Sequence, residues 1–118
     1  MKRILIIDDD RVIGEMLKYM FKLKGYKVWT LTHPAKAFQA VQDNKIDLII
    51  LDNLLPGVKG SHLCSILKKN PQTINVPVIM MSGLPEVKTE CLHAGATAFI
   101  AKPFDMKTFF KKVETVLA

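Results

Sequence analysis

Residues 4–9 read ILIIDD, a run of four aliphatic residues followed by two aspartates. An aliphatic run of this length is typical of a strand buried on both faces, as in a parallel sheet covered by helices. Residues 48–52 repeat the pattern as LIILD, with Asp52 directly after the run. The carboxyl ends of parallel strands lie along one edge of the sheet, so we expect Asp8, Asp9 and Asp52 to meet there.

The rest of the chain alternates short apolar runs with helical patterns. Five strands, each followed by a helix, predict an α/β fold with a doubly wound, five-stranded parallel sheet and five helices. No linker or repeat interrupts the pattern, so residues 1–118 are expected to form a single domain with no output domain. The strands are predicted at residues 3–8, 27–31, 46–51, 76–81 and 97–101, and the helices at residues 11–24, 34–43, 60–69, 85–93 and 105–117.

The helical patterns also predict which side chains face the core. In residues 11–24 an apolar stripe follows Asp10, a plausible N-cap, and Gly25 ends the helix. Residues 60–69 are expected to bury Leu63, Ile66 and Leu67. The predicted stripe of the first helix contains Val12, Ile13, Met16, Leu17 and Met20.

Composition limits the classes of protein to consider. Of the 118 residues 49% are hydrophobic, but no apolar run approaches the length of about 20 residues that spans a bilayer. The amino terminus has only four apolar residues before three aspartates, which is unlike a signal peptide. We therefore expect a cytoplasmic protein without membrane contact.

The net charge is +6, and several of the 11 acidic residues belong to or border the predicted acidic pocket, so the remaining surface is basic. Ordinary solvated lysines explain this, and an acidic protein partner is the sharper alternative. Direct nucleic-acid binding is disfavoured, because the lysines are scattered and no recognition-helix or aromatic-stacking motif accompanies them.

The predicted pocket has the chemistry of a cation and phosphate site. Clustered carboxylates repel one another, and a hard cation such as Mg²⁺ among their oxygens relieves that repulsion. Lys102 follows the apolar residues 97–101 at the same edge and would hold an anion beside the metal. A carboxylate such as Asp52, flanked by a cation and a lysine, is a competent nucleophile toward phosphorus. The hydroxyl of Ser82 is placed to bond a phosphoryl oxygen, although Ser82 alone is equally a strand-end serine.

The order and spacing of these residues resemble the receiver domain of two-component response regulators over about residues 3–117. Five motifs carry the resemblance, and each is weak alone. They are Asp8-Asp9, the Asp-x-x-Met-Pro-x-x-x-Gly signature at residues 52–60 with Leu55 in place of Met, Ser82-Gly83, Gly95-Ala96, and Lys102-Pro103-Phe104.

The resemblance implies an aspartyl-phosphate switch rather than an enzyme, in a domain that assists its own phosphorylation and dephosphorylation. Asp52 would accept a phosphoryl group from a phosphohistidine on a sensor histidine kinase or a histidine phosphotransfer protein. Asp9 would bind Mg²⁺ directly and Asp8 chiefly through water, and the backbone carbonyl of Leu54 would complete the protein ligands. The sequence identifies neither the cognate kinase nor the downstream protein partner.

The resemblance also assigns the switch residues. Lys102, expected to precede a cis bond to Pro103, would pair with the phosphoryl oxygens. Ser82 would swing toward the phosphate, and Phe99 would follow it inward. The chain departs from the family where Phe99 replaces the common tyrosine. It also departs in the short stretch at residues 82–95, which predicts a short or displaced fourth helix.

Two alternatives stay open. Residues 8–12 match the Asp-x-Asp-x-Val motif of haloacid-dehalogenase-type phosphatases, which would make Asp8 the nucleophile. That family needs a late acidic pair, and only Asp105 and Glu114 follow Lys102. The second alternative is a pseudo-receiver, an interaction module that is never phosphorylated.

Overall fold

Five strands form one parallel sheet in the order β2-β1-β3-β4-β5 in the computed structural model, which describes residues 1–118. The chain first adds β2 on one side of β1 and then crosses to add β3 on the other side. This reversal opens a crevice at the carboxyl ends of β1 and β3, where α/β proteins bind ligands. The strands are β1 (Arg3–Ile7), β2 (Lys27–Leu31), β3 (Leu48–Asp52), β4 (Val78–Ser82) and β5 (Ala98–Ala101).

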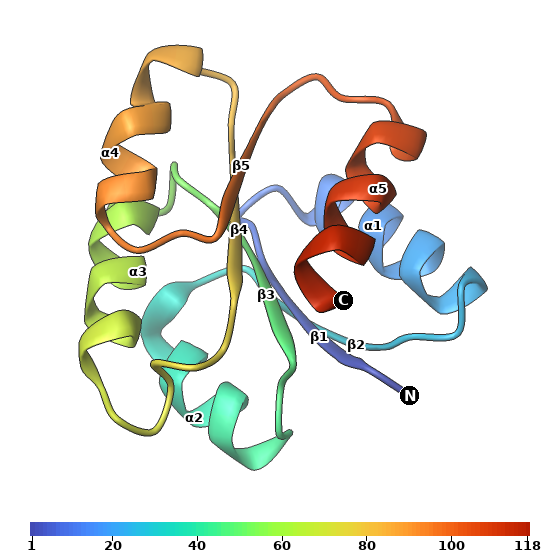
Figure 1. Cartoon of the computed structure of the whole chain (residues 1–118), viewed down its shortest axis with the longest axis horizontal. Helices are drawn as coiled ribbons and strands as arrows, with labels where there is room; N and C mark the ends of the chain where they lie inside the picture. Colours follow the sequence, from blue (N-terminus) through green and yellow to red (C-terminus); the bar gives the residue numbers. More distant parts are fainter.

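Helices cover both faces of the sheet, which confirms the predicted doubly wound fold. Figure 1 shows α1 and α5 side by side on one face and α2, α3 and α4 on the other. None of these helices combines the length and the apolar character that crossing a membrane requires. The helices are α1 (Arg11–Leu23), α2 (Ala37–Asp43), α3 (Gly60–Lys69), α4 (Lys88–His93) and α5 (Met106–Leu117).

Short 3₁₀ turns account for two differences from the predicted helices. Pro34–Lys36 and Pro85–Val87 each form such a turn before α2 and α4. Proline suits a first turn because it has no N–H to leave unpaired. The fourth helix is consequently only six residues long, and its predicted shortness is confirmed.

Strand β1 shows how the aliphatic runs build the core. Its alternate side chains enter two clusters, Leu5 and Ile7 on the α2–α3–α4 side and Ile4 and Ile6 on the α1–α5 side. All four are fully buried, each stabilising the fold by about 1.5–3 kcal/mol relative to exposure. This two-sided burial explains why the strands read as continuous apolar runs instead of alternating patterns.

Local signals set the ends of α1 as predicted. The Asp10 carboxylate accepts hydrogen bonds from the backbone N–H groups of Val12 and Ile13, at 3.0 and 3.3 Å. The helix ends before Gly25, whose φ of 89° is a left-handed conformation that suits glycine. Both ends of α1 are therefore encoded locally, by Asp10 at its start and by Gly25 after its last turn.

Part of the predicted core is wrong. Val12 is 78% exposed and Met16 45% exposed, so the buried side of α1 is narrower than the predicted stripe. Ile66 of α3 is likewise 48% exposed. Both α1 and α3 cover the sheet with only part of their apolar surface, and these apolar residues face outward.

Candidate functional site

Three carboxylates meet at the carboxyl end of the sheet, as the sequence predicts. Asp8, Asp9 and Asp52 each place one oxygen so that all three atoms lie within 4.8 Å of one another. Asp8 and Asp52 are buried, whereas Asp9 is exposed. Strands β1 and β3 pair directly, so the residues that end them are neighbours although 44 positions separate Asp8 from Asp52 in the sequence.

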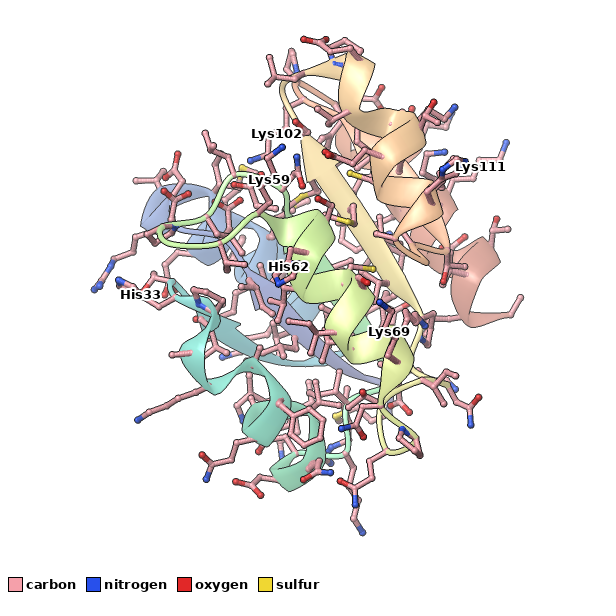
Figure 2. The ribbon with its side chains drawn as sticks, turned by 90° about the vertical axis from the view of Figure 1, so that its left-hand side faces the viewer. His33, Lys59, His62, Lys69, Lys102 and Lys111 are labelled. Atoms are coloured by element: carbon pink, nitrogen blue, oxygen red, sulfur yellow. The ribbon has the colours of Figure 1, made fainter.

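Lys102 joins this cluster from the end of β5. Its Nζ lies 3.2 Å from Asp8 Oδ2 and 3.3 Å from Asp52 Oδ1, so one ammonium group bridges two buried carboxylates. The backbone N–H of Lys102 donates to the carbonyl of Ser82 at 2.8 Å, and the bond to Pro103 is cis as expected. In Figure 2 Lys102 and Lys59 lie at the same end of the molecule.

Asp8 is held on both of its oxygens. Oδ1 accepts a hydrogen bond from the backbone N–H of Asp10 at 2.9 Å, and Oδ2 accepts one from Lys102. Asp52 is held on only one, because Lys102 donates to Oδ1 and no protein group donates to Oδ2. No buried polar side-chain atom lacks a partner, so Oδ2 of Asp52 keeps contact with solvent. Asp52 therefore offers a free oxygen for reaction, whereas Asp8 does not.

The charges of the pocket shift two ionisation equilibria. The pKa of Asp52 rises to about 6, chiefly because the carboxylate is buried and next because Asp8 repels it, while Lys102 lowers it in part. Burial acts to lower the pKa of Lys102, but the attraction of Asp52 and Asp8 outweighs it and the net pKa is raised. Lys102 is thus charged at neutral pH and only partly balances the acids.

The segment after Asp52 is fixed by Asn53, a residue that sequence reasoning missed. Asn53 donates its backbone N–H to Met81 and accepts from the N–H of Gly60 at its carbonyl, at 2.9 and 2.8 Å. Its side-chain Oδ1 accepts from the backbone N–H of Ser61 at 2.9 Å. The residue directly before α3 is Lys59, whose side chain makes no capping hydrogen bond. The missing local cap is the one sign in the sequence that the cap comes from elsewhere, here from the buried Asn53.

Gly60 allows this segment to close. A Cβ built at Gly60 would lie 2.2 Å from the carbonyl oxygen of Asp52 and 2.7 Å from Cα of Asn53. Both are backbone atoms of the residues that form the site. Only glycine lets the start of α3 approach the end of β3 so closely.

Ser82 and Phe99 occupy neighbouring strands beside the pocket. Ser82 ends β4 next to β3, is buried, and accepts a hydrogen bond from the backbone N–H of Leu84 at Oγ, 3.0 Å away. Phe99 lies on β5 and is 7% exposed, with its ring packed in the core cluster on the α2–α3–α4 side. The ring is thus already inside the protein in this structure, and its movement with Ser82 stays a prediction.

Leu54 lies in the loop beyond Asp52 and forms an isolated antiparallel bridge with Lys59. Its side chain is 75% exposed. The bridge ties the two sides of this loop together, with Leu54 two residues after Asp52 in the chain. The role of its carbonyl as a metal ligand stays a prediction.

Comparison with known proteins gives a consistent result. The family model of the response regulator receiver domain matches residues 4–114. The phosphate regulon transcriptional regulatory protein PhoB of Pseudomonas aeruginosa is 35% identical over 118 residues, which cover 98% of this chain and 52% of PhoB. The chain spans about half the length of the curated relatives it matches.

Solved structures share this fold. The chemotaxis response regulator CheY4 of Vibrio cholerae superposes with a TM-score of 0.91 at 29% identity, covering 99% of both chains. The response regulator TrrA of Thermotoga maritima, solved in complex with Mg²⁺ and BeF, gives a TM-score of 0.89 at 27% identity, covering 99% of this chain and 100% of TrrA.

Two glycine substitutions should have opposite effects on stability. Gly60→Ala should lower the free energy of unfolding by about 1–3 kcal/mol, because the added methyl meets backbone atoms that cannot rotate away. Gly14→Ala should raise it by up to about 1 kcal/mol, because a Cβ there contacts nothing and alanine favours the helix. Urea unfolding of the two variants measures both effects, and equal midpoints would contradict this account of Gly60.

The raised pKa of Asp52 predicts a pH dependence of stability in metal-free protein. The folded state holds this proton more tightly than the unfolded state, so stability falls as pH rises from about 4 to about 6. At pH 8 in EDTA, Asp52→Asn should be more stable than wild type by about 1–2 kcal/mol, discounted because the pocket is partly open to water.

Asp105→Asn provides a control, because the contribution of Asp105 to stability changes with pH in the opposite direction to that of Asp52. Hydrogen bonds from Thr108 lower the pKa of Asp105, so this acid stabilises the protein above its unfolded pKa and loses that effect as pH falls. Thermal melts between pH 3 and pH 8 would compare the two variants. An Asp52→Asn variant that is less stable than wild type at pH 8 would contradict the electrostatic account of the pocket.

Proposed function

Because this chain belongs to the response regulator receiver family, we propose that it is a phosphoacceptor switch, phosphorylated on Asp52 in the presence of Mg²⁺. The observation that carries the proposal is the Lys102 ammonium bridging Asp8 and Asp52 while Asp52 Oδ2 stays free of protein donors. Phosphoryl transfer depends mainly on positioning and charge neutralisation. The arrangement supports the positioning, and Lys102 together with a bound cation would supply the neutralisation.

The proposed reaction transfers a phosphoryl group from a phosphohistidine. A carboxylate oxygen of Asp52 forms the new bond to phosphorus while the bond from phosphorus to the imidazole nitrogen breaks, and the imidazole keeps that electron pair. Lys102 then pairs with the phosphoryl oxygens, and the hydroxyl of Ser82 turns from the N–H of Leu84 to donate to one of them. The phosphodonor would be a sensor histidine kinase or a histidine phosphotransfer protein in the cytoplasm.

The acidic cluster fits a hard divalent cation. Three carboxylates share the pocket with a single ammonium group, which leaves negative charge uncompensated, and Mg²⁺ prefers oxygen ligands. We assign Asp9, Asp52 and the carbonyl of Leu54 as ligands, with Asp8 acting through water. When bound, Mg²⁺ would neutralise charge on the phosphoryl oxygens and the reacting carboxylate.

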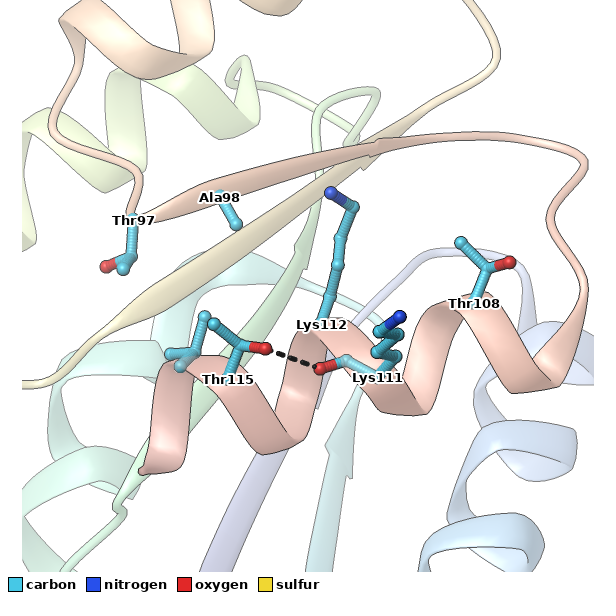
Figure 3. Close-up of a pocket in the computed structure, with 7 residues that line it drawn as sticks. Thr97, Ala98, Thr108, Lys111, Lys112 and Thr115 are labelled. Atoms are coloured by element: carbon cyan, nitrogen blue, oxygen red, sulfur yellow. Dashed lines mark hydrogen bonds between the residues drawn. The ribbon is translucent and has the colours of Figure 1, made fainter.

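The output is proposed to be a change in protein binding on the face formed by α4, β5 and α5. A hollow of about 510 Å³ lies there, and Figure 3 shows Thr97 and Ala98 opposite Thr115 and Lys112 of α5. Ser82 and Phe99 lie in the two strands nearest this face. A downstream partner would sense the switch through its effect on this surface, and the domain itself would bind no nucleic acid.

Phosphorylation should occur on Asp52 alone. After incubation with acetyl phosphate and Mg²⁺, mass spectrometry should find one acyl phosphate on the wild type and none on Asp52→Asn, because that substitution removes the nucleophilic oxygen. Asp43→Asn, an exposed acid at the end of α2, should label like wild type.

The labelled position also separates the alternatives. Labelling of Asp8 would indicate a haloacid-dehalogenase-type phosphatase, and absence of any label would indicate a pseudo-receiver. Asp52→Asn labelled at the wild-type level would exclude Asp52 as the phosphoacceptor.

Mg²⁺ should stabilise the protein by mass action. At a Mg²⁺ concentration of 100 times Kd the free energy of unfolding should rise by about 2.7 kcal/mol. Asp9→Ala should lose most of this stabilisation, whereas Asp43→Ala should keep it. Differential scanning calorimetry with and without Mg²⁺ measures the effect, and equal responses of the two variants would rule out Asp9 as a ligand.

A further inference from the structure

Strand β2 is an edge of the sheet, with β1 on one side of it and no strand on the other. The backbone N–H of Lys27 donates to the carbonyl of Lys2 at 3.0 Å, at the start of the strand. At its end the carbonyl of Leu31 accepts from the N–H of Asp8, also at 3.0 Å. Parallel strands bond through alternate residues, so the odd-numbered residues of β2 direct their backbone groups toward β1.

The even-numbered residues of β2, Val28 and Thr30, therefore direct their backbone N–H and C=O groups away from the sheet. No backbone group of a turn or loop bonds to them. Two donors and two acceptors are thus open to a further strand along this edge.

The edge carries few of the features that discourage strand pairing. Proteins usually shield an edge with charged side chains, a proline or a bulge. Strand β2 reads KVWTL, so Lys27 is its single charged residue and it contains no proline. Trp29, Thr30 and Leu31 are each partly exposed. The carboxyl half of β2 is therefore the part best suited to accept another strand.

Two hollows flank this carboxyl half, one on each face of the sheet. The first, of about 200 Å³, lies between β2 and α1 and is lined by Thr30, Arg11 and Glu15 among others. The second, of about 230 Å³, lies between β2 and α2, with Leu31 and Ala40 as its apolar lining. Leu31 lines both hollows. Side chains of an added strand would point alternately to the two faces, so neighbouring residues would enter different hollows.

A stripe of mostly basic residues on α1 runs beside the same edge. Arg11, Glu15, Lys18 and Lys22 are spaced four, three and four residues apart, which places them on one side of the helix. Arg11 and Glu15 line the first hollow, so this side of α1 borders β2. We call these four residues the α1 basic stripe. It is about 16 Å long at 1.5 Å per residue, which matches the five residues of β2 at about 3.3 Å each.

The charges around the edge favour an acidic partner over a second copy of this chain. Glu15 is the single acid in the α1 basic stripe, and Lys27 adds a further cation at the start of β2. On the other face Lys36 and Asp43, which both line the second hollow, offset each other. Two copies paired edge to edge would bring two basic stripes together, and like charges oppose such an interface.

We propose that the β2 edge binds an extended acidic segment of a partner protein, which adds to the sheet as a sixth strand. In this mode of recognition, main-chain hydrogen bonds supply affinity and pockets for alternate side chains supply specificity. Acidic side chains of the segment lie along the α1 basic stripe, and the alternate, apolar side chains enter the hollow lined by Leu31 and Ala40. The binding requires neither phosphorylation of Asp52 nor Mg²⁺, so it stands or falls separately from the proposed function.

The test uses a fluorescein-labelled heptapeptide in which Glu and Val alternate, since valine favours strands and the alternation suits either strand direction. Fluorescence anisotropy is measured with the unphosphorylated full chain without Mg²⁺. We expect saturable binding that weakens as salt is raised. In NMR hydrogen exchange, saturating unlabelled peptide should slow exchange of the Val28 and Thr30 amide protons about tenfold or more, because these donors become hydrogen-bonded.

Thr30→Pro removes one of the outward donors and leaves the bonds to β1 in place. Proline is tolerated in an edge strand where the N–H faces solvent. This variant should weaken peptide binding about tenfold or more while its circular dichroism spectrum stays that of wild type. The double variant Lys18→Glu with Lys22→Glu tests the charges independently of the backbone, and it should also weaken binding about tenfold or more.

The matched control is Lys69→Glu with Lys107→Glu, which makes the same change in net charge. These two lysines are exposed on α3 and α5, away from the β2 edge. The control pair should change the dissociation constant by less than about twofold, within the scatter of surface substitutions.

Any of five results would overturn the proposal. Three concern the peptide: absence of saturable binding, equal binding of a peptide with Lys in place of Glu, and equal weakening by the two double variants. The fourth is unchanged exchange of the Val28 and Thr30 amides in the bound state, which would place the peptide elsewhere. The fifth is a concentration-dependent dimer in sedimentation that Thr30→Pro disperses, which would assign the edge to a second copy of this chain.

Discussion

The ammonium of Lys102, shared between Asp8 and Asp52, is the interaction on which the rest of the site depends. It links the ends of β1, β3 and β5. In the sheet β1 and β3 are neighbours, whereas β4 lies between β3 and β5. Burying two carboxylates without such a partner would cost several kcal/mol for each ion. The lysine reduces this cost without removing it, which is why the pKa of Asp52 stays above its ordinary value.

This incomplete compensation suits the proposed phosphoacceptor switch better than a fully neutral pocket would. A structure that satisfied every charge internally would have no electrostatic reason to admit a cation, and the proposed role of that cation is to offset the charge of a phosphoryl group. Here one lysine serves a cluster of three carboxylates, and Asp52 at the end of β3 keeps one oxygen free of protein donors. The free-energy cost of burying Asp52 and its proposed reactivity therefore have the same origin, namely buried negative charge that a single lysine only partly balances.

The sequence predicts the sheet and most of the cluster because the relevant signals are local. Each aliphatic run forms a strand, and each polar residue that ends a run must lie at the carboxyl edge. The strand ends were less well predicted, since Asp52 and Ser82 belong to their strands, whereas Ile46 and Asp47 precede β3. Backbone pairing with neighbouring strands decides such boundaries, and pairing is not visible in one segment alone.

Other features depend on contacts between distant segments. The bond from Ser61 to Asn53 and the exposure of Val12 follow from how the helices lie on the sheet, and periodicity alone cannot supply that placement. Periodicity therefore assigns Val12 to the core, whereas the structure places it at the surface.

Gly60 is required for folding, whereas Asp52 is required for the proposed signalling. Its missing Cβ is required by the backbone of Asp52 and Asn53, whether or not the protein ever carries a phosphoryl group. In a deep mutational scan every replacement at this position should be depleted by a screen for folded protein as strongly as by a screen for signalling. Intolerance at Gly60 would thus report on chain geometry, whereas Asp52→Asn should survive the first screen and fail only the second.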